Sequence, residues 1–191
     1  MNALSTDEAR AAIAGGQASL GIELGSTRIK ACLIAETGQV LAVGSHEWEN
    51  SYVDRAWTYS LDEVWSGIQA AYAALGIRVQ QAYGMAIESL ASIGISAMMH
   101  GYLAFDAQDQ LLVPFRTWRN TSTSAAASEL SDLFGVNIPL RWSIAHYRQA
   151  MLDAEPHVGA IDRLTTLAGY VHTALTGSRV LGVGDASGMF P

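Results

Sequence analysis

The sequence predicts an α/β domain with a mixed β-sheet, in which three leading antiparallel strands are flanked by helices. Strand-like apolar runs follow one another from residue 19 to residue 46, separated only by turn residues. A long helical pattern then precedes another strand-like run, and a helix between two strands permits a parallel crossover. Half of the 191 residues are hydrophobic and only 15% are charged, which is enough apolar sequence for such a core.

A short helix precedes the sheet. Ser5–Glu8 has the form of a capping box, and the alanine-rich run after it ends at Gly15-Gly16. We expect residues 1–18 to be a helical extension and residues 19–191 to hold the domain itself. Met1–Gln17 has early acidic residues and no long apolar run, so we expect no signal peptide.

Three strands open the predicted sheet, joined by short turns. They span about Ser19–Leu24, Lys30–Ala35 and Val40–His46. Gly25-Ser26-Thr27 connects the first two strands, and Glu36–Gln39 connects the next two. Connections this short can only reverse the chain, so we expect the strands to be antiparallel.

The turn after the first strand also has the composition of an anion site. Glu23 ends the strand, and Gly25 lets the backbone approach a ligand closely. Ser26 and Thr27 add hydroxyl groups, and Lys30 follows with a positive charge. This turn suits a phosphate with its Mg²⁺ ion, because Mg²⁺ prefers carboxylate, water and phosphate oxygens. From these residues alone, an ordinary hairpin turn is the alternative.

A long helix and a further strand follow. Ser60–Glu63 is a second capping box, after which apolar side chains recur on one helical face. The run Leu90–Ser96 is nearly continuous in apolar and small residues, so we expect a central strand covered on both faces. The predicted helix face consists of Val64, Trp65, Ile68, Ala71, Tyr72 and Leu75.

The second half of the chain predicts a hairpin, three helices and a last strand-like segment. Tyr102–Phe105 and Leu111–Val113 flank the turn of the hairpin. The segment from Val180 is apolar, turns at Gly184–Gly188 and stops at Pro191 without a polar tail, so we expect a domain truncated before it is complete. The helices are expected at Thr121–Phe134, Ser143–Met151 and Leu167–Thr176.

Composition excludes several function classes. The net charge of −7 disfavours nucleic acid and anionic membrane surfaces, since both reward clustered Lys and Arg. Cys32 is the only cysteine, so neither a disulfide framework nor a cysteine-based zinc site is expected. We expect it to be a small buried residue in a cytoplasmic protein.

Four segments, in this order, resemble the FGGY carbohydrate kinases, most closely the xylulokinases. They are Gly21–Lys30, Gly94–Gly101 with its Met-His-Gly sequence, Val113–Asn120, and Leu175–Gly177 followed by Asp185–Gly188. The resemblance covers Ser19–Pro191. It implies a ribonuclease-H-like domain of the actin-like ATPase kind, and makes this chain a partial FGGY N-terminal domain.

The resemblance assigns roles in the first segment. Glu23 would hold Mg²⁺ or its water shell, where the family usually has Asp. Gly25, Ser26 and Thr27 would face the transferred phosphoryl group of ATP, and Lys30 would neutralise its charge. The longer Glu side chain can change direct metal contact into contact through water.

The resemblance also assigns the sugar side. Met99 and His100 would line the sugar pocket, with Trp118 and Asp185 on the same side. The residues themselves leave other roles open: a turn role for His100, a core role for Trp118, and a turn or cap for Asp185. Arg119-Asn120 stands where the family usually has Asn-Asp.

The function implied is ATP-dependent phosphorylation of a sugar, such as the ketopentose xylulose, by a full-length parent. The family's catalytic Asp lies further along, beyond Pro191, so we expect this chain alone to be inactive. Ribulose and gluconate are alternative substrates. An actin-like or chaperone-like ATPase and a non-catalytic sugar-binding module are alternative functions.

An incomplete sheet exposes an edge, so we also expect low solubility or self-association, for example as a homodimer. A stable monomer in light scattering would contradict that expectation.

Overall fold

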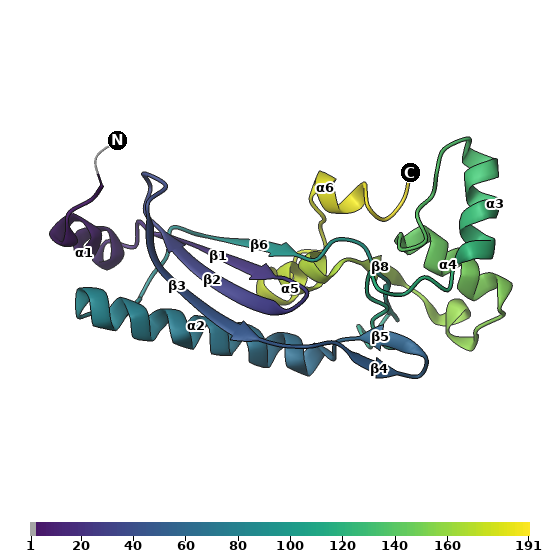
Figure 1. Ribbon diagram of the computed structural model, residues 1–191, viewed down its shortest axis with the longest axis horizontal. Helices are drawn as coiled ribbons and strands as arrows, with labels where there is room; N and C mark the ends of the chain where they lie inside the picture. The colour runs from purple at the N-terminus through teal and green to yellow at the C-terminus, as the bar shows by residue number, and fades with distance from the viewer. Residues whose placement is uncertain (1–2) are drawn as a thin grey trace. The chain divides into compact units, whose positions relative to one another are not determined.

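The computed structural model describes residues 3–191 and divides the chain into two compact units (Figure 1). One, here called the sheet unit, takes residues 61–97 and the described part of residues 1–49. The other, called the helical unit, takes residues 50–60 and 98–191. Among the described residues, no helix is both long and apolar enough to cross a membrane.

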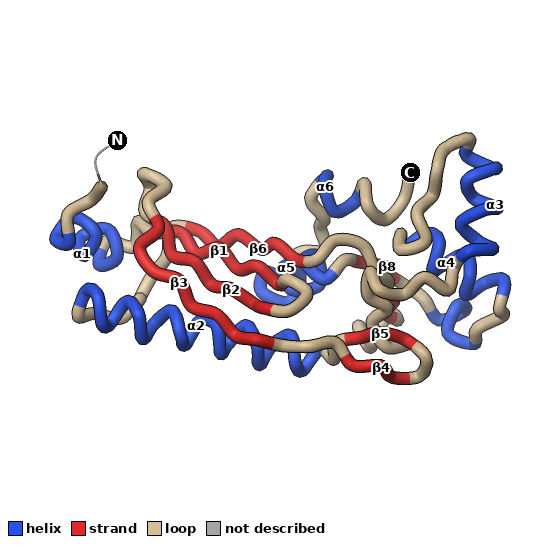
Figure 2. The backbone as a smooth tube through the Cα atoms, in the orientation of Figure 1, coloured by secondary structure: helices blue, strands red, loops and turns tan. Residues whose placement is uncertain are grey.

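The sheet unit holds one four-stranded sheet of order β3-β2-β1-β6 (Figure 2). β1 pairs antiparallel with β2, β2 pairs antiparallel with β3, and β1 pairs parallel with β6, so the predicted mixed sheet is confirmed. The capping box at α1 is also confirmed: the Ser5 side chain accepts from the Glu8 backbone N–H, and the Glu8 side chain accepts from the Ser5 backbone N–H. The elements are α1 (Thr6–Ala14), β1 (Ser19–Leu24), β2 (Arg28–Ile34), β3 (Val40–Glu47), α2 (Leu61–Tyr83) and β6 (Ser92–Ala97).

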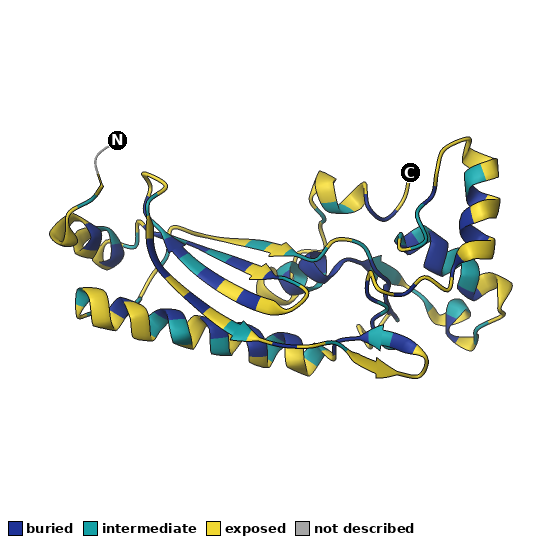
Figure 3. Ribbon diagram, viewed as in Figure 1, coloured by how far each residue is buried: buried dark blue, intermediate teal, exposed yellow. Residues whose placement is uncertain are grey.

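One face of this sheet packs against α2, which runs along it in Figure 1. Alternate residues of β1 and β2 are buried there, and Figure 3 shows the resulting stripes. Gly44 of β3 sets the close approach, because a Cβ at this position would lie 2.2 Å from the Ala71 carbonyl oxygen and the Leu75 nitrogen. On the helix itself, Val64, Ile68, Ala71 and Leu75 are buried as predicted, whereas Tyr72 is exposed.

The prediction that the strand after α2 is covered on both faces is wrong. β6 has a partner on one side only, and Ser92, Ile93 and Gly94 are exposed. Ile93 is 51% exposed although it lies on the same face of the sheet as buried Leu20. The apolar run is real, but α2 lies over the antiparallel strands, with most of its contacts to β3 and β2, rather than over this edge.

The helical unit is built from short strands and helices around a buried aromatic group. Phe105 stacks on Tyr170 with ring centroids 5.7 Å apart, and Tyr102 and Phe115 are fully buried. Its elements are β4 (Ser51–Val53), β5 (Ala56–Thr58), β7 (Leu103–Phe105), α3 (Ser124–Phe134), α4 (Ser143–Leu152), the 3₁₀-helix η1 (Pro156–Ala160), β8 (Arg163–Thr165), α5 (Leu167–Thr176) and α6 (Val183–Ala186).

One prediction for this unit is wrong and another is confirmed in part. The chain reverses between residues 102 and 113 as predicted, with an antiparallel bridge between Phe105 and Leu111 and a Leu112 nitrogen that donates to the Ala104 carbonyl at 2.9 Å. Residues 111–113 form no strand, however, and β7 pairs along its length with β8. The strand-like run from Val180 is irregular and leads into the short helix α6. The second strand of the hairpin was wrongly predicted because pairing partners distant in sequence decide which apolar runs become strands. The β4–β5 hairpin was not predicted.

Candidate functional site

The turn between β1 and β2 is a tight hairpin turn. The Gly25 nitrogen donates to the Arg28 carbonyl at 3.0 Å, and a Cβ on Gly25 would lie 3.0 Å from that same oxygen. Ser26 and Thr27 at the tip are exposed, as a ligand-facing turn requires. The position of the glycine is therefore explained by the turn itself, and the hydroxyl groups stand at its open end.

Trp48 braces this turn from the end of β3. Its indole nitrogen donates to the Gly25 carbonyl at 2.7 Å, and its backbone nitrogen donates to the Thr27 carbonyl at 3.2 Å. Two carbonyl oxygens, which would repel a phosphate, are thereby engaged by donors. The sequence analysis did not identify Trp48. The available signal was a tryptophan that directly follows β3, the strand that pairs with β2.

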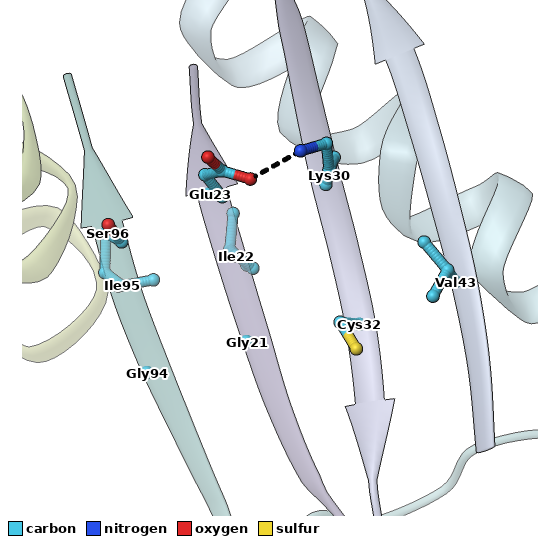
Figure 4. A pocket seen from close by; sticks show the side chains of 9 residues that line it. All are labelled: Gly21, Ile22, Glu23, Lys30, Cys32, Val43, Gly94, Ile95 and Ser96. Atoms are coloured by element: carbon cyan, nitrogen blue, oxygen red, sulfur yellow. Dashed lines mark hydrogen bonds and ion pairs between the residues drawn. The ribbon is translucent and has the colours of Figure 1, made fainter. Parts of the chain in front are cut away.

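Glu23 and Lys30 lie opposite each other on β1 and β2, on the face of the sheet away from α2 (Figure 4). The Lys30 ammonium nitrogen is 2.9 Å from a Glu23 carboxylate oxygen, and both side chains are about half exposed. Each therefore partners the other. A phosphate and its metal ion would have to draw Lys30 and Glu23 apart to use them separately.

The residues present give Mg²⁺ a single protein carboxylate here. Among the residues that the structure describes, no three His, Cys, Asp or Glu side chains gather into a metal-binding group. One carboxylate fits Mg²⁺ only as an ion that arrives with nucleotide phosphates and keeps most of its waters. Glu23 fits that limited role and does not fit a dedicated protein cage.

The open face of the sheet carries a hollow of about 500 Å³ beside this ion pair (Figure 4). Its floor includes Cys32, Gly21 and Gly94, which pair across three adjacent strands. Cys32 is only half-buried, so the prediction that it is a buried residue is wrong. The alternation of β2 turns Cys32 to the same face as Lys30, away from α2.

In the helical unit, His100 and Gly101 share an unusual backbone. Their φ angles are 69° and 103°, in the left-handed region that favours glycine. A Cβ on Gly101 would lie 2.7 Å from the Phe115 ring, so only glycine fits there. The His100 ring is half-buried, and its Nδ1 lies 3.2 Å from the Gly188 carbonyl oxygen. Two segments of the predicted sugar site, which are far apart in sequence, therefore meet.

The other predicted sugar-site residues differ in exposure. The Met99 side chain is 56% exposed and Trp118 is 36% exposed, so each has surface to offer a ligand. Asp185 is half-buried in α6, where burial raises the pKa of its carboxyl group and a hydrogen bond with Thr166 opposes that rise. Glu23, Gly25, Ser26, Thr27 and Lys30 belong to the sheet unit, whereas Met99, His100, Trp118 and Asp185 belong to the helical unit.

The Arg119-Asn120 pair has a structural role. The Asn120 side chain accepts from the Trp57 nitrogen and donates to the Trp57 carbonyl, both at 2.8 Å. The Arg119 guanidinium lies 3.8 Å from the centre of the Trp57 ring and donates to Asn50. These contacts tie the β4–β5 hairpin to residues 117–120. Arg119 and Asn120, which stand where the family usually has Asn-Asp, therefore both make structural contacts with the hairpin and the residue before it.

A buried polar cluster next to Gly101 was not predicted. The Tyr102 hydroxyl is 2.9 Å from His157 Nε2, and Glu155 holds Arg116 through both carboxylate oxygens. Burial raises the pKa of Tyr102, opposed by Arg116, and burial lowers the pKa of His157, opposed by Glu155. Burial, helped by Arg116, lowers the pKa of His146 to about 3. Neither ring nitrogen of His146 has a hydrogen-bond partner among the described residues.

Comparison with known proteins gives one family. A model of the N-terminal domain of the FGGY family of carbohydrate kinases matches residues 18–190. The xylulose kinase of Lactococcus lactis is 24% identical over 178 residues, which are 88% of this chain and 35% of that protein. This chain therefore spans about a third of the length of that relative.

Solved structures give the same fold. A xyloylose kinase from Brucella ovis superposes with a TM-score of 0.76 at 22% identity, covering 88% of this chain and 36% of its own. A gluconate kinase from Lactobacillus acidophilus gives 0.74 at 16% identity, covering 90% and 36%. At these identities the likeness establishes the fold, which is mixed α/β with a mixed sheet as in the FGGY sugar kinases.

Proposed function

Because this chain belongs to the FGGY family of carbohydrate kinases, we propose that it is part of an enzyme that transfers a phosphoryl group from ATP to a sugar hydroxyl. The observation that carries the sugar side is the meeting of His100 with Gly188, beside the exposed Met99. We propose residues 19–191 as a partial N-terminal domain, preceded by a helical extension, in a cytoplasmic protein.

The turn between β1 and β2 would hold the phosphate end of the nucleotide. The exposed hydroxyl groups of Ser26 and Thr27 and the turn at Gly25 would face the transferred phosphoryl group. Lys30 would leave its ion pair with Glu23 and form an ion pair with the phosphate oxygens instead. Mg²⁺, when bound, would screen the phosphate charges, and Glu23 would contact it directly or through water.

The helical unit would hold the sugar. Met99 offers an exposed apolar side chain, and His100 offers a ring nitrogen that Gly188 does not occupy. Trp118 and Asp185 are proposed on the same side. We propose a ketopentose such as xylulose as the substrate, with ribulose and gluconate as alternatives.

The site in this chain is incomplete in one respect. Phosphoryl transfer needs a carboxylate that accepts the proton of the sugar hydroxyl. We propose that this base, an Asp, lies in sequence beyond Pro191, since this chain spans about a third of the length of the Lactococcus lactis relative. The chain alone would then bind without turning over.

Two other functions are kept as candidates. A sugar-independent ATPase would use the same turn, and the His100 and Met99 arrangement argues against it. A non-catalytic sugar-binding module is favoured by Glu23 in place of Asp and by the structural use of Arg119 and Asn120. Glu23→Asp in a full-length protein separates the module from the kinase, since an inactive protein that stays inactive favours the module.

A coupled ADP-release assay tests the proposal. It uses ATP, Mg²⁺ and D-xylulose, with D-ribulose and D-gluconate in parallel, on this chain and on a full-length protein that contains it. We expect sugar-dependent ADP release from the full-length protein and none from the chain alone. Turnover by the chain alone would contradict the missing base, and ADP release without any sugar would favour the ATPase.

A further inference from the structure

We propose that Gly188 positions His100 for ligand binding by fixing which of its ring nitrogens carries the proton. The His100 Nδ1 atom lies 3.2 Å from the Gly188 carbonyl oxygen. A carbonyl oxygen only accepts hydrogen bonds, so Nδ1 must be the donor. In a neutral imidazole the proton on Nδ1 leaves Nε2 with a free lone pair. Nε2 of His100 is therefore presented as an acceptor.

The N-terminal turn of α4 holds the two partners together. The Ser143 hydroxyl donates to the Gly101 carbonyl at 2.6 Å, next to His100. The following residue, Ile144, donates its backbone N–H to the Met189 carbonyl at 3.0 Å, next to Gly188. Ser143 and Met189 are both buried. Two consecutive residues of one helix thus fix both sides of the contact, so it is preorganised rather than adventitious.

Position 188 has little space for a side chain. A Cβ there would lie 3.0 Å from His100 Nδ1 and 3.4 Å from its Cε1. The backbone angle φ of Gly188 is not in the left-handed region, so alanine can adopt this conformation. The cost of alanine therefore falls on the His100 ring, which must give way by a few tenths of an ångström beside the carbonyl.

The fixed tautomer selects the ligand group. An acceptor at Nε2 binds a hydrogen-bond donor, such as a sugar hydroxyl, and repels a carboxylate or phosphate oxygen. Resting on the proposed function, this inference assigns a hydroxyl of a polyol to His100 and disfavours the carboxylate of a sugar acid at that point. Gly188 is thus a positioning residue that acts through His100.

Nitrogen-15 NMR of the histidine rings tests the proposal directly in the 191-residue chain. The His100 signals are assigned by their loss in His100→Asn, and the ring is observed in its neutral form. We expect the proton on Nδ1. A neutral His100 that carries its proton on Nε2 overturns the proposal, and this result needs no variant at Gly188.

Two alanine variants complete the test. We expect Gly188→Ala to lose the Nδ1 tautomer or to mix the two. Gly184→Ala is the matched control, because it lies in the same segment and its Cβ would have no described atom within 4 Å.

A titration separates this inference from the proposed function. D-xylulose is added to the wild-type chain while the same His100 signals are followed. A shift at Nε2 with the proton kept on Nδ1 supports both claims. If the tautomer is as expected and D-xylulose shifts no His100 signal, the sugar assignment fails and the positioning by Gly188 stands.

Discussion

The Lys30 ammonium nitrogen lies 2.9 Å from the Glu23 carboxylate, and the two residues are register partners on β1 and β2. Both belong to the proposed phosphate site, and in this structure they neutralise each other. Since both side chains are about half exposed, the pair is worth little to folding. Its charges are therefore available to a phosphate and its metal ion at small cost.

Replacing Lys30 separates binding from stability. We expect Lys30→Met to change the free energy of unfolding by less than about 1 kcal/mol, because exposed ion pairs contribute little. The same variant should weaken binding of Mg·ATP, which carries the phosphoryl group that Lys30 is proposed to contact, measured by isothermal titration calorimetry. Arg148→Met, which breaks the exposed Arg148–Glu129 pair in the helical unit, is the control and should leave binding unchanged. Equal affinities for Lys30→Met and the wild type would remove Lys30 from the phosphate site.

The packing of α2 on the sheet predicts a large effect at Gly44. A Cβ would lie 2.2 Å from backbone atoms of α2, so the helix must shift. We expect Gly44→Ala to lower the free energy of unfolding by about 3 kcal/mol, measured by urea denaturation. Gly94→Ala is the control, since its Cβ would meet no described atom within 4 Å and alanine favours a strand over glycine. Similar stabilities for the two variants would contradict this packing.

Because the Asn120 amide is buried and hydrogen-bonded, we expect an Asp at this position to lower the free energy of unfolding. Asn120→Asp removes the donor to the Trp57 and Thr117 carbonyls and places a carboxylate against both oxygens. We expect a loss of about 3 kcal/mol in urea denaturation, because a buried unpaired charge costs more than a lost hydrogen bond. Asn50→Ala, which removes only the exposed acceptor of Arg119, should cost less than about 1 kcal/mol. A stable Asn120→Asp variant would show that the hairpin anchor is not as described.

Buried His146 makes stability depend on pH. Its pKa in the folded chain is about 3, below the ordinary value of 6.5, so the unfolded chain takes up the proton first. Its contribution is full above about pH 6.5 and is lost as the pH falls toward 3. We expect stability to fall by about 1.4 kcal/mol per pH unit below pH 6.

Urea denaturation at several pH values between 7.5 and 5 checks this dependence. His146→Leu, of similar size and without a titratable group, should flatten most of it. A part should remain in that variant, since burial also lowers the pKa of His157. A His146→Leu profile that keeps the full slope would assign the effect to other groups.

What the sequence predicted well was local. β1, β2 and β3 follow from apolar runs joined by short turns, and α2 follows from the helical spacing of its apolar residues. The turn of Gly25 to Thr27 was recognised because its residue types carry its geometry. Contacts between residues that are close in sequence can be predicted from the residue types of that short segment.

What the sequence missed depends on distant partners. β7 pairs along its length with the distant β8, and the Trp48 side chain donates to the Gly25 carbonyl. β4 and β5 have three residues each, too few for a pattern. β6 is apolar but uncovered, since an apolar run does not tell which neighbour will pack on it. The contact of His100 with Gly188 was not predicted, since the two residues are far apart in sequence.

The most direct test of the sugar-kinase account is the melting temperature of this chain with and without D-xylulose. A ligand at ten times its Kd adds about 1.4 kcal/mol, which corresponds to a rise of about 3–6 °C for a chain of this size. The account predicts this rise for the wild type and its loss in His100→Ala. A melting temperature that rises with Mg·ATP and not with D-xylulose would contradict the account and favour an ATPase without a sugar substrate.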